Sequence, residues 1–120
     1  MNISKLAKSW QKYLTKNKNE GLRALDNKGE IKVKFKLGQL VATRGINARL
    51  LEDSDFSKFL WDSFARYKNC DWGDIPHEDK KMNDSAVKNN DDRIVARYNN
   101  IYIITEYDRS VTTILFTHEY

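Results

Sequence analysis

Cysteine, proline, glycine and histidine are all scarce in this chain of 120 residues, which has one cysteine, one proline, five glycines and two histidines. The single cysteine, Cys70, cannot form an internal disulfide, which fits a reducing compartment such as the cytoplasm, and we interpret it as a structural thiol. None of the glycines lies in a Walker or dinucleotide-binding fingerprint, which disfavours an enzyme that cradles phosphates. Neither His77 nor His118 belongs to a recognisable serine or cysteine catalytic motif.

Long apolar runs are also missing. No run approaches the roughly 18 to 20 residues that span a bilayer, and the N-terminus lacks the apolar block and cleavage site of a signal peptide. We therefore expect a cytoplasmic protein without membrane contact. Hydrophobic residues make up 40% of the chain and 14 residues are aromatic, which suffices for the core of one small domain.

Metal-ligand spacings such as CxxC or HExxH are absent as well. A metal site would have to draw on Cys70, Asp71, Asp74, His77 and Glu78. A metal-dependent nuclease would pair Glu78 and Lys80 with Asp71 or Asp74, but such a pair normally lies on a strand, and here an exposed helix is expected. The sequence therefore predicts no metal, no cofactor and no enzymatic activity.

Charge is distributed unevenly along the chain. Residues 1–37 carry ten lysines or arginines against three acids, a net charge of +7, whereas residues 38–120 carry eleven against fourteen, a net charge of −3. Apolar side chains at spacings of three and four predict an amphipathic helix over 3–16 with a basic back. The lysines expected to contact a partner are Lys5, Lys8, Lys12, Lys16 and Lys18. The alternative is a docked helix whose lysines are simply solvated.

We divide the chain into a basic N-terminal helix and linker, 1–29, and one core domain, 30–120. The sequence of the core domain predicts an α+β fold, in which two or three helices pack on a small antiparallel sheet that ends in a three-stranded meander. The expected strands are 30–37, 40–43, 93–98, 101–107 and 111–116. Helices are expected from Asn47, after a cap at Ser54 or Asp55, and from Pro76 with Asp74 as its cap.

Polar side chains that are candidates for partner binding cluster in sequence around two turns. They are Asp71, Trp72, Glu106, Asp108 and Arg109, beside Thr112 and Thr113. On the central strand Glu106 shares a face with Tyr102 and Ile104, an apolar setting for a carboxylate. One interpretation is structural, with these groups fixing turns and cross-strand pairs. The other is an exposed polar patch that a protein partner recognises, since Trp, Tyr and Arg are the usual anchors of interfaces.

Three stretches carry a family resemblance. They are FKLGQLVATRGI at 35–46, CDWGDIPHEDKKMND at 70–84 and IITEYDRSVTTILF at 103–116, with a closing Glu-Tyr. Together they resemble a family of small proteins borne on bacterial plasmids and phages, often labelled plasmid-related proteins or type I restriction subunits. Residues 1 to about 33 lie outside the shared pattern, and Thr117 stands where similar members commonly have proline.

The resemblance implies an accessory role in a mobile genetic element. Small proteins of such elements often inhibit host defence nucleases, so we expect a non-enzymatic inhibitor of anti-CRISPR type. Its partner would be a CRISPR effector or restriction enzyme, or the nucleoprotein complex of such a nuclease. The alternative is a nucleic-acid-binding accessory protein for plasmid or phage replication or regulation, in which the N-terminal lysines neutralise phosphates.

Overall fold

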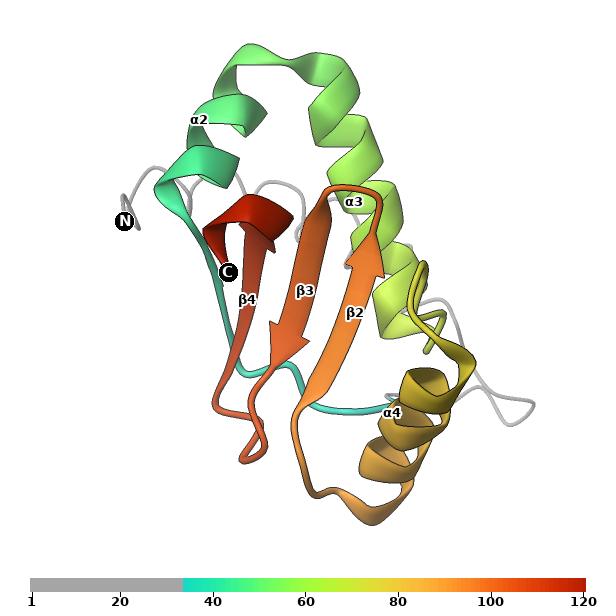
Figure 1. Ribbon diagram of the computed structural model, residues 1–120. Coiled ribbons are helices and arrows are strands. Elements are labelled where there is room, and N and C mark those ends of the chain that lie inside the picture. The colour runs from blue at the N-terminus through green and yellow to red at the C-terminus, as the bar shows by residue number, and fades with distance from the viewer. Residues whose placement is uncertain (1–33) are drawn as a thin grey trace, which may run out of the picture.

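A computed structural model describes residues 34–120, which form three α-helices and a four-stranded sheet (Figure 1). In chain order the elements are β1 Gln39–Ala42, α2 Arg44–Glu52, α3 Ser54–Lys68, α4 His77–Asn89, β2 Ile94–Tyr98, β3 Ile101–Thr105, β4 Val111–Phe116 and the 3-10 turn η1 Thr117–Glu119. The expected α+β class is confirmed. The predicted basic helix and linker over 1–29 lie outside the described residues, as do Lys5, Lys8, Lys12, Lys16 and Lys18.

The strands are ordered β1-β4-β3-β2 across the sheet. The last three strands form the predicted antiparallel meander, with Ile103 opposite both Ala96 and Ile114. β1 instead pairs with β4 in parallel, with Ala42 opposite Ile114. The sheet is therefore mixed, which corrects the expectation of a wholly antiparallel sheet. Parallel neighbours need a crossover connection, and here all three helices and two strands lie between them in the chain.

The predicted strand over 30–37 does not form in the part that the structure describes. Residues from position 34 to Gly38 have no strand assignment, and the first strand begins only at Gln39. Phe35 and Leu37 are half-buried and pack against the core, while the lysines beside them are exposed. The alternation of apolar and basic residues thus reflects an irregular segment that is buried on one side.

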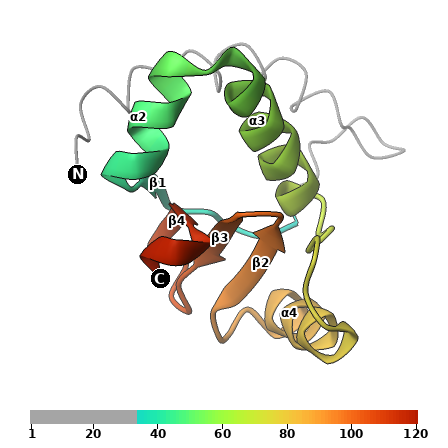
Figure 2. The ribbon, with the colours of Figure 1, turned by 45° about the horizontal axis from the view of Figure 1, so that its top comes forward.

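Helices α2 and α3 cover one face of the sheet (Figure 2). Asp53 ends α2 and caps α3, because its carboxylate accepts a hydrogen bond of 3.0 Å from the backbone N–H of Phe56. The cap thus lies one residue before Ser54 and two before Asp55, the two predicted caps. The aromatic face of α3 is buried as predicted, with Phe64 and Tyr67 fully enclosed. Helix α4 begins at His77 without a side-chain cap, so Asp74 does not have the predicted capping role.

The buried hydroxyl groups of Tyr67, Thr105 and Thr112 form a hydrogen-bonded series, which we call the hydroxyl chain. The hydroxyl oxygens of Tyr67 and Thr105 are 2.6 Å apart, and those of Thr105 and Thr112 are 2.7 Å apart. Thr112 donates to the carbonyl oxygen of Leu37 at 2.6 Å. Because each hydroxyl has one proton to donate, this last bond fixes the direction of the others: Tyr67 donates to Thr105, and Thr105 donates to Thr112. The hydroxyl chain therefore joins α3, β3, β4 and the segment before β1.

Candidate functional site

Residues 71–74, which we call the clasp, fasten the end of α3 to the edge of β2. Asp71 is exposed and accepts hydrogen bonds from Nε and Nη2 of Arg66, at 2.8 and 3.2 Å. The Arg66 guanidinium holds the pKa of the Asp71 carboxyl below its usual value. The carboxylate of Asp74 accepts a hydrogen bond of 2.8 Å from the backbone N–H of Asn99, in the turn between β2 and β3. Both aspartates therefore hold the clasp in place.

The two central residues of the clasp also have structural roles. Trp72 is only 2% exposed, and its indole N–H donates to the carboxylate of Asp84 on α4 at 2.9 Å. Gly73 has a φ of +75°, and a Cβ there would lie 2.0 Å from the carbonyl oxygen of Arg97. Only glycine fits this close approach without displacing backbone. The clasp thus contacts α3, α4 and β2 at once.

Arg109 is buried at the end of the sheet opposite the clasp, where it connects two parts of the fold. It is 6% exposed and occupies the left-handed region, with a φ of +59°. Its guanidinium donates to five carbonyl oxygens, those of Ala86, Asp91, Asp92, Glu106 and Tyr107. Because the last carbonyls of a helix lack intrahelical donors, a cation near the end of α4 is favourable. Arg109 ties the turn between β3 and β4 to the C-terminus of α4.

The remaining two residues predicted to bind a partner, Asp108 and Glu106, lie beside Arg109 in the sequence. Asp108 is exposed, and hydrogen bonds from the side chain and backbone of Ser110 lower the pKa of its carboxyl. Glu106 is half-buried, and its backbone N–H donates to the carbonyl oxygen of Val111 at 3.0 Å. The five residues expected to form one exposed polar patch therefore do not form it. They divide between the two ends of β3, and Trp72 and Arg109 are buried because each bonds to groups distant in sequence.

The residue set weighed for a metal is not gathered into a centre either. Within residues 34–120, no group of three or more histidine, cysteine, aspartate or glutamate side chains is arranged to hold a metal ion. Cys70 is half-buried, and burial raises the pKa of its thiol. Asp71 and Asp74 are bound within the clasp.

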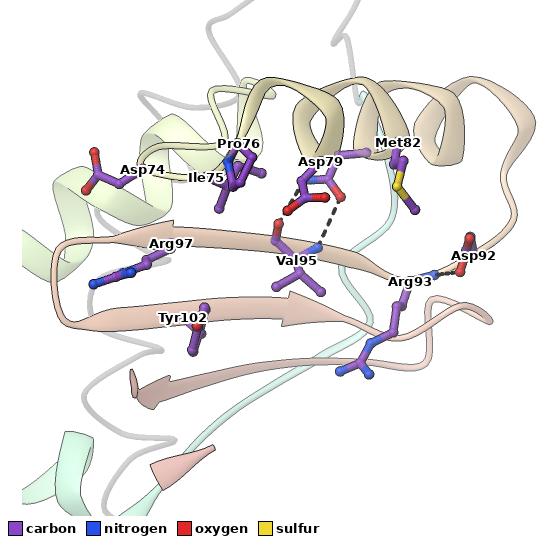
Figure 3. Close-up of a pocket in the computed structure, with 11 residues that line it drawn as sticks. Asp74, Ile75, Pro76, Asp79, Met82, Asp92, Arg93, Val95, Arg97 and Tyr102 are labelled. Carbon is purple, nitrogen blue, oxygen red and sulfur yellow. Dashed lines mark hydrogen bonds between the residues drawn. The ribbon is translucent and has the colours of Figure 1, made fainter. Parts of the chain in front are cut away.

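A groove lies between α4 and the face of β2 and β3 that α2 and α3 do not cover (Figure 3). It encloses about 520 Å³. We call it the α4 groove; its lining residues are Asp74, Ile75, Pro76, Asp79, Met82, Asn83, Asp92, Arg93, Val95, Arg97 and Tyr102. Val95 and Tyr102 belong to it because they alternate along their strands with core residues. Its volume lies within the range of known ligand pockets.

Asn83 holds α4 against β2 and closes the edge of the sheet. Its side-chain amide donates to the carbonyl oxygen of Val95 at 2.8 Å and accepts from the Val95 N–H at 3.3 Å. Further along the same edge, the N–H of Arg97 donates to the carbonyl of Trp72, and its carbonyl accepts from the N–H of Asp74. An edge covered in this way offers little backbone for another strand to pair with.

Two charged groups in the α4 groove are free to meet a ligand. Arg97 Nε already donates to the carbonyl of Asn99 at 2.8 Å, and Asp92 accepts from the N–H of Arg93 at 2.9 Å. The guanidinium of Arg93 and the carboxylate of Asp79, however, have no hydrogen bond or ion pair within residues 34–120. As far as residues 34–120 are concerned, an unpaired cation and an unpaired anion thus share one groove.

The sequence alone singles out none of these groove residues as partner-binding. Met82 is expected from the helical pattern to face inward, yet it is 63% exposed in the groove. Two features of the sequence do relate to the groove. Met82 is an apolar side chain on a very polar helix, and every second residue of β2 and β3 must face away from the core. They become informative only once α4 is known to lie beside β2.

Comparison with protein-family models, curated proteins and solved structures yields no match. The resemblance to a family of plasmid and phage proteins therefore stays a prediction. Among residues 34–120, no helix has the length and apolar character that crossing a membrane requires.

Proposed function

We propose that this chain is a non-enzymatic protein that inhibits a bacterial defence nuclease, a CRISPR effector or a restriction enzyme, by binding it in the cytoplasm. The observation that carries the proposal is the α4 groove. It combines an exposed methionine and a tyrosine with an arginine, Arg93, whose guanidinium has no partner within residues 34–120. These residue types are enriched at protein interfaces and among their energetic anchors. The choice of a defence nuclease as partner rests on the motifs at 35–46, 70–84 and 103–116.

The N-terminal residues add electrostatic attraction in this proposal. Residues 1–33 carry eight basic and three acidic side chains, a net charge of +5, while residues 34–120 carry thirteen against fourteen, a net charge of −1. A basic segment next to a nearly neutral domain speeds association with an acidic or nucleoprotein partner. Lys5, Lys8, Lys12, Lys16 and Lys18 are the side chains proposed for this contact.

A plasmid-challenge assay tests the proposal. Cells with an active CRISPR or restriction system receive a plasmid that the system attacks, with and without expression of this chain. We expect the chain to raise plasmid recovery in at least one system and to bind the purified nuclease of that system. A chain that protects no plasmid across the candidate systems would show that the proposal is wrong.

The same charge imbalance favours a second function, that of a nucleic-acid-binding accessory protein for plasmid or phage replication or regulation. It predicts binding of DNA or RNA that weakens steeply as salt rises, because bound lysines release counterions from phosphates. Replacing Lys5, Lys8, Lys12 and Lys16 with glutamate should abolish the binding. A purified chain that shifts no nucleic acid even at low salt would exclude this function.

A further inference from the structure

The free charges of the α4 groove lie on opposite walls. Asp79 belongs to α4, and Arg93 precedes β2 and extends beside β3 (Figure 3). The apolar side chains of Met82, on the helix wall, and Val95, on the strand wall, line the same groove. A ligand that satisfies this groove therefore needs an apolar centre with a positive group on one side and a negative group on the other.

The charge balance of the groove separates a polypeptide ligand from a nucleic acid. Asp74, Asp79 and Asp92 line it against Arg93 and Arg97, so acids outnumber bases three to two. Nucleic acid binds chiefly through lysines and arginines that neutralise successive phosphates. A groove with more acids than bases has no net positive charge to attract such a backbone, whereas a polypeptide can present both signs of charge.

The closed edge of β2 determines how a polypeptide could bind. The outward N–H and carbonyl groups of Val95 are both bonded to Asn83, and those of Arg97 are bonded to the clasp. A partner segment cannot extend the sheet there by strand addition, the mode that depends on free backbone groups. It must be recognised through its side chains.

We propose that the α4 groove binds an extended segment of the partner protein in which an apolar side chain lies between one acidic and one basic residue. The apolar side chain packs on Met82 and Val95, the acidic residue pairs with the guanidinium of Arg93, and the basic residue pairs with the carboxylate of Asp79. This inference rests on the proposed function for the identity of the partner as a defence nuclease.

The first test needs no knowledge of the nuclease. A display library of random peptides is selected on the immobilised full-length chain, and single peptides are then measured in solution. We expect the enriched peptides to carry the acidic, apolar and basic pattern, and Arg93→Glu to weaken their binding at least about tenfold. Changing the acidic peptide residue to lysine should restore binding to the Arg93→Glu chain. The matched control is Lys88→Glu, an exposed change on α4 outside the groove.

Some outcomes would overturn the inference. A selection that enriches no peptide would do so, as would peptides that bind Arg93→Glu and the unchanged chain equally. Binding of a DNA or RNA oligonucleotide that Arg93→Glu abolishes would assign the groove to nucleic acid instead. Thermal unfolding of each variant confirms that it is folded, and Arg93→Gln replaces Arg93→Glu if the charge reversal prevents folding.

A second test distinguishes failure of the inference from failure of the proposed function. In the plasmid challenge we expect Met82→Glu and Arg93→Glu to lose protection while Lys88→Glu keeps it. If the unchanged chain protects and both groove variants protect equally well, the inference is wrong and the inhibitor function stands. If selected peptides bind the groove as expected but no plasmid is protected, the inhibitor function is wrong and the groove specificity stands.

Discussion

The guanidinium of Arg109 donates a hydrogen bond of 2.9 Å to the carbonyl oxygen of Ala86, across 23 positions of the chain. This bond joins the last turn of α4 to the turn between β3 and β4. It belongs to the set of five carbonyl contacts that enclose the guanidinium, and no carboxylate is among them. Arg109 therefore acts as a helix cap supplied from a distant part of the chain.

Replacing Arg109 with methionine should destabilise the domain severely. The change keeps much of the apolar stem but removes the side-chain donor of five carbonyl oxygens, of which only those of Ala86 and Glu106 keep a backbone donor. We expect a loss of about 3 kcal/mol in the free energy of unfolding. Urea denaturation followed by circular dichroism measures this. Arg93→Met is the control, because the Arg93 guanidinium has no bond within residues 34–120, and it should change stability by less than about 0.5 kcal/mol. Similar losses in the two variants would contradict the role of Arg109.

Gly73→Ala should unfold or strongly destabilise the domain. The new Cβ would lie 2.0 Å from the backbone oxygen of Arg97 and would occupy a residue with a φ of +75°. We expect a loss of about 3 kcal/mol or more, measured by thermal unfolding. Gly45→Ala provides the contrast, because its Cβ would meet side-chain atoms and no backbone: the end of Glu119 at 2.8 Å and the Phe116 ring at 3.4 Å. If both variants melt at the same temperature, the clasp does not constrain position 73.

Thr112→Val tests the chain of buried hydroxyls. The substitution keeps the shape of the side chain but leaves the Leu37 carbonyl without its donor and Thr105 without its acceptor, which should cost about 2 kcal/mol. Thr113→Val is a matched control on the opposite face of the same strand, where the side chain is half-buried and has no hydrogen bond within the described part of the chain. Chemical denaturation compares the two. Equal effects would mean that the hydroxyl chain contributes nothing beyond the packing of the strand.

Stability should fall as the solution becomes alkaline. Burial raises the pKa of the Tyr67 and Tyr98 phenols above their ordinary value of 10.0. The unfolded chain then releases these protons at a lower pH than the folded chain does. The stabilisation is complete below pH 10 and is lost as the pH rises through the folded-state values. Denaturation measured on both sides of pH 10 checks this, and Tyr67→Phe should make the alkaline decline shallower. An unchanged decline would contradict the assignment.

Much of the fold could be predicted from the local periodicity of apolar residues. The aromatic spacing of α3 and the alternation of β2, β3 and β4 each depend on neighbours in sequence, and all four elements are found close to the expected bounds. β3 ends at Thr105, however, so Glu106 does not belong to the central strand as predicted. The same alternation predicts a strand at Phe35 and Leu37, where one-sided burial alone produces it. The parallel partner of β1 could not be predicted, because β4 lies about 70 residues further along the chain.

The candidate site was harder to predict for a related reason. Trp72 and Arg109 have the chemistry of interface anchors, and only their distant partners Asp84 and Ala86 show that they are used internally. In the α4 groove, Asp79, Arg93 and Tyr102 come from three separate segments. No spacing rule connects them, because their proximity depends on where α4 packs.

The parallel pairing of β1 with β4 also limits how early the sheet can form while the chain is being synthesised. Residues 39–42 leave the ribosome early, but their pairing partners at 111–114 are made only after all three helices have emerged. Until then the aromatic face of α3 has no complete sheet to cover, and the nascent chain exposes it. The four-stranded sheet therefore cannot be complete before β4 has been made, because β4 lies between β1 and β3.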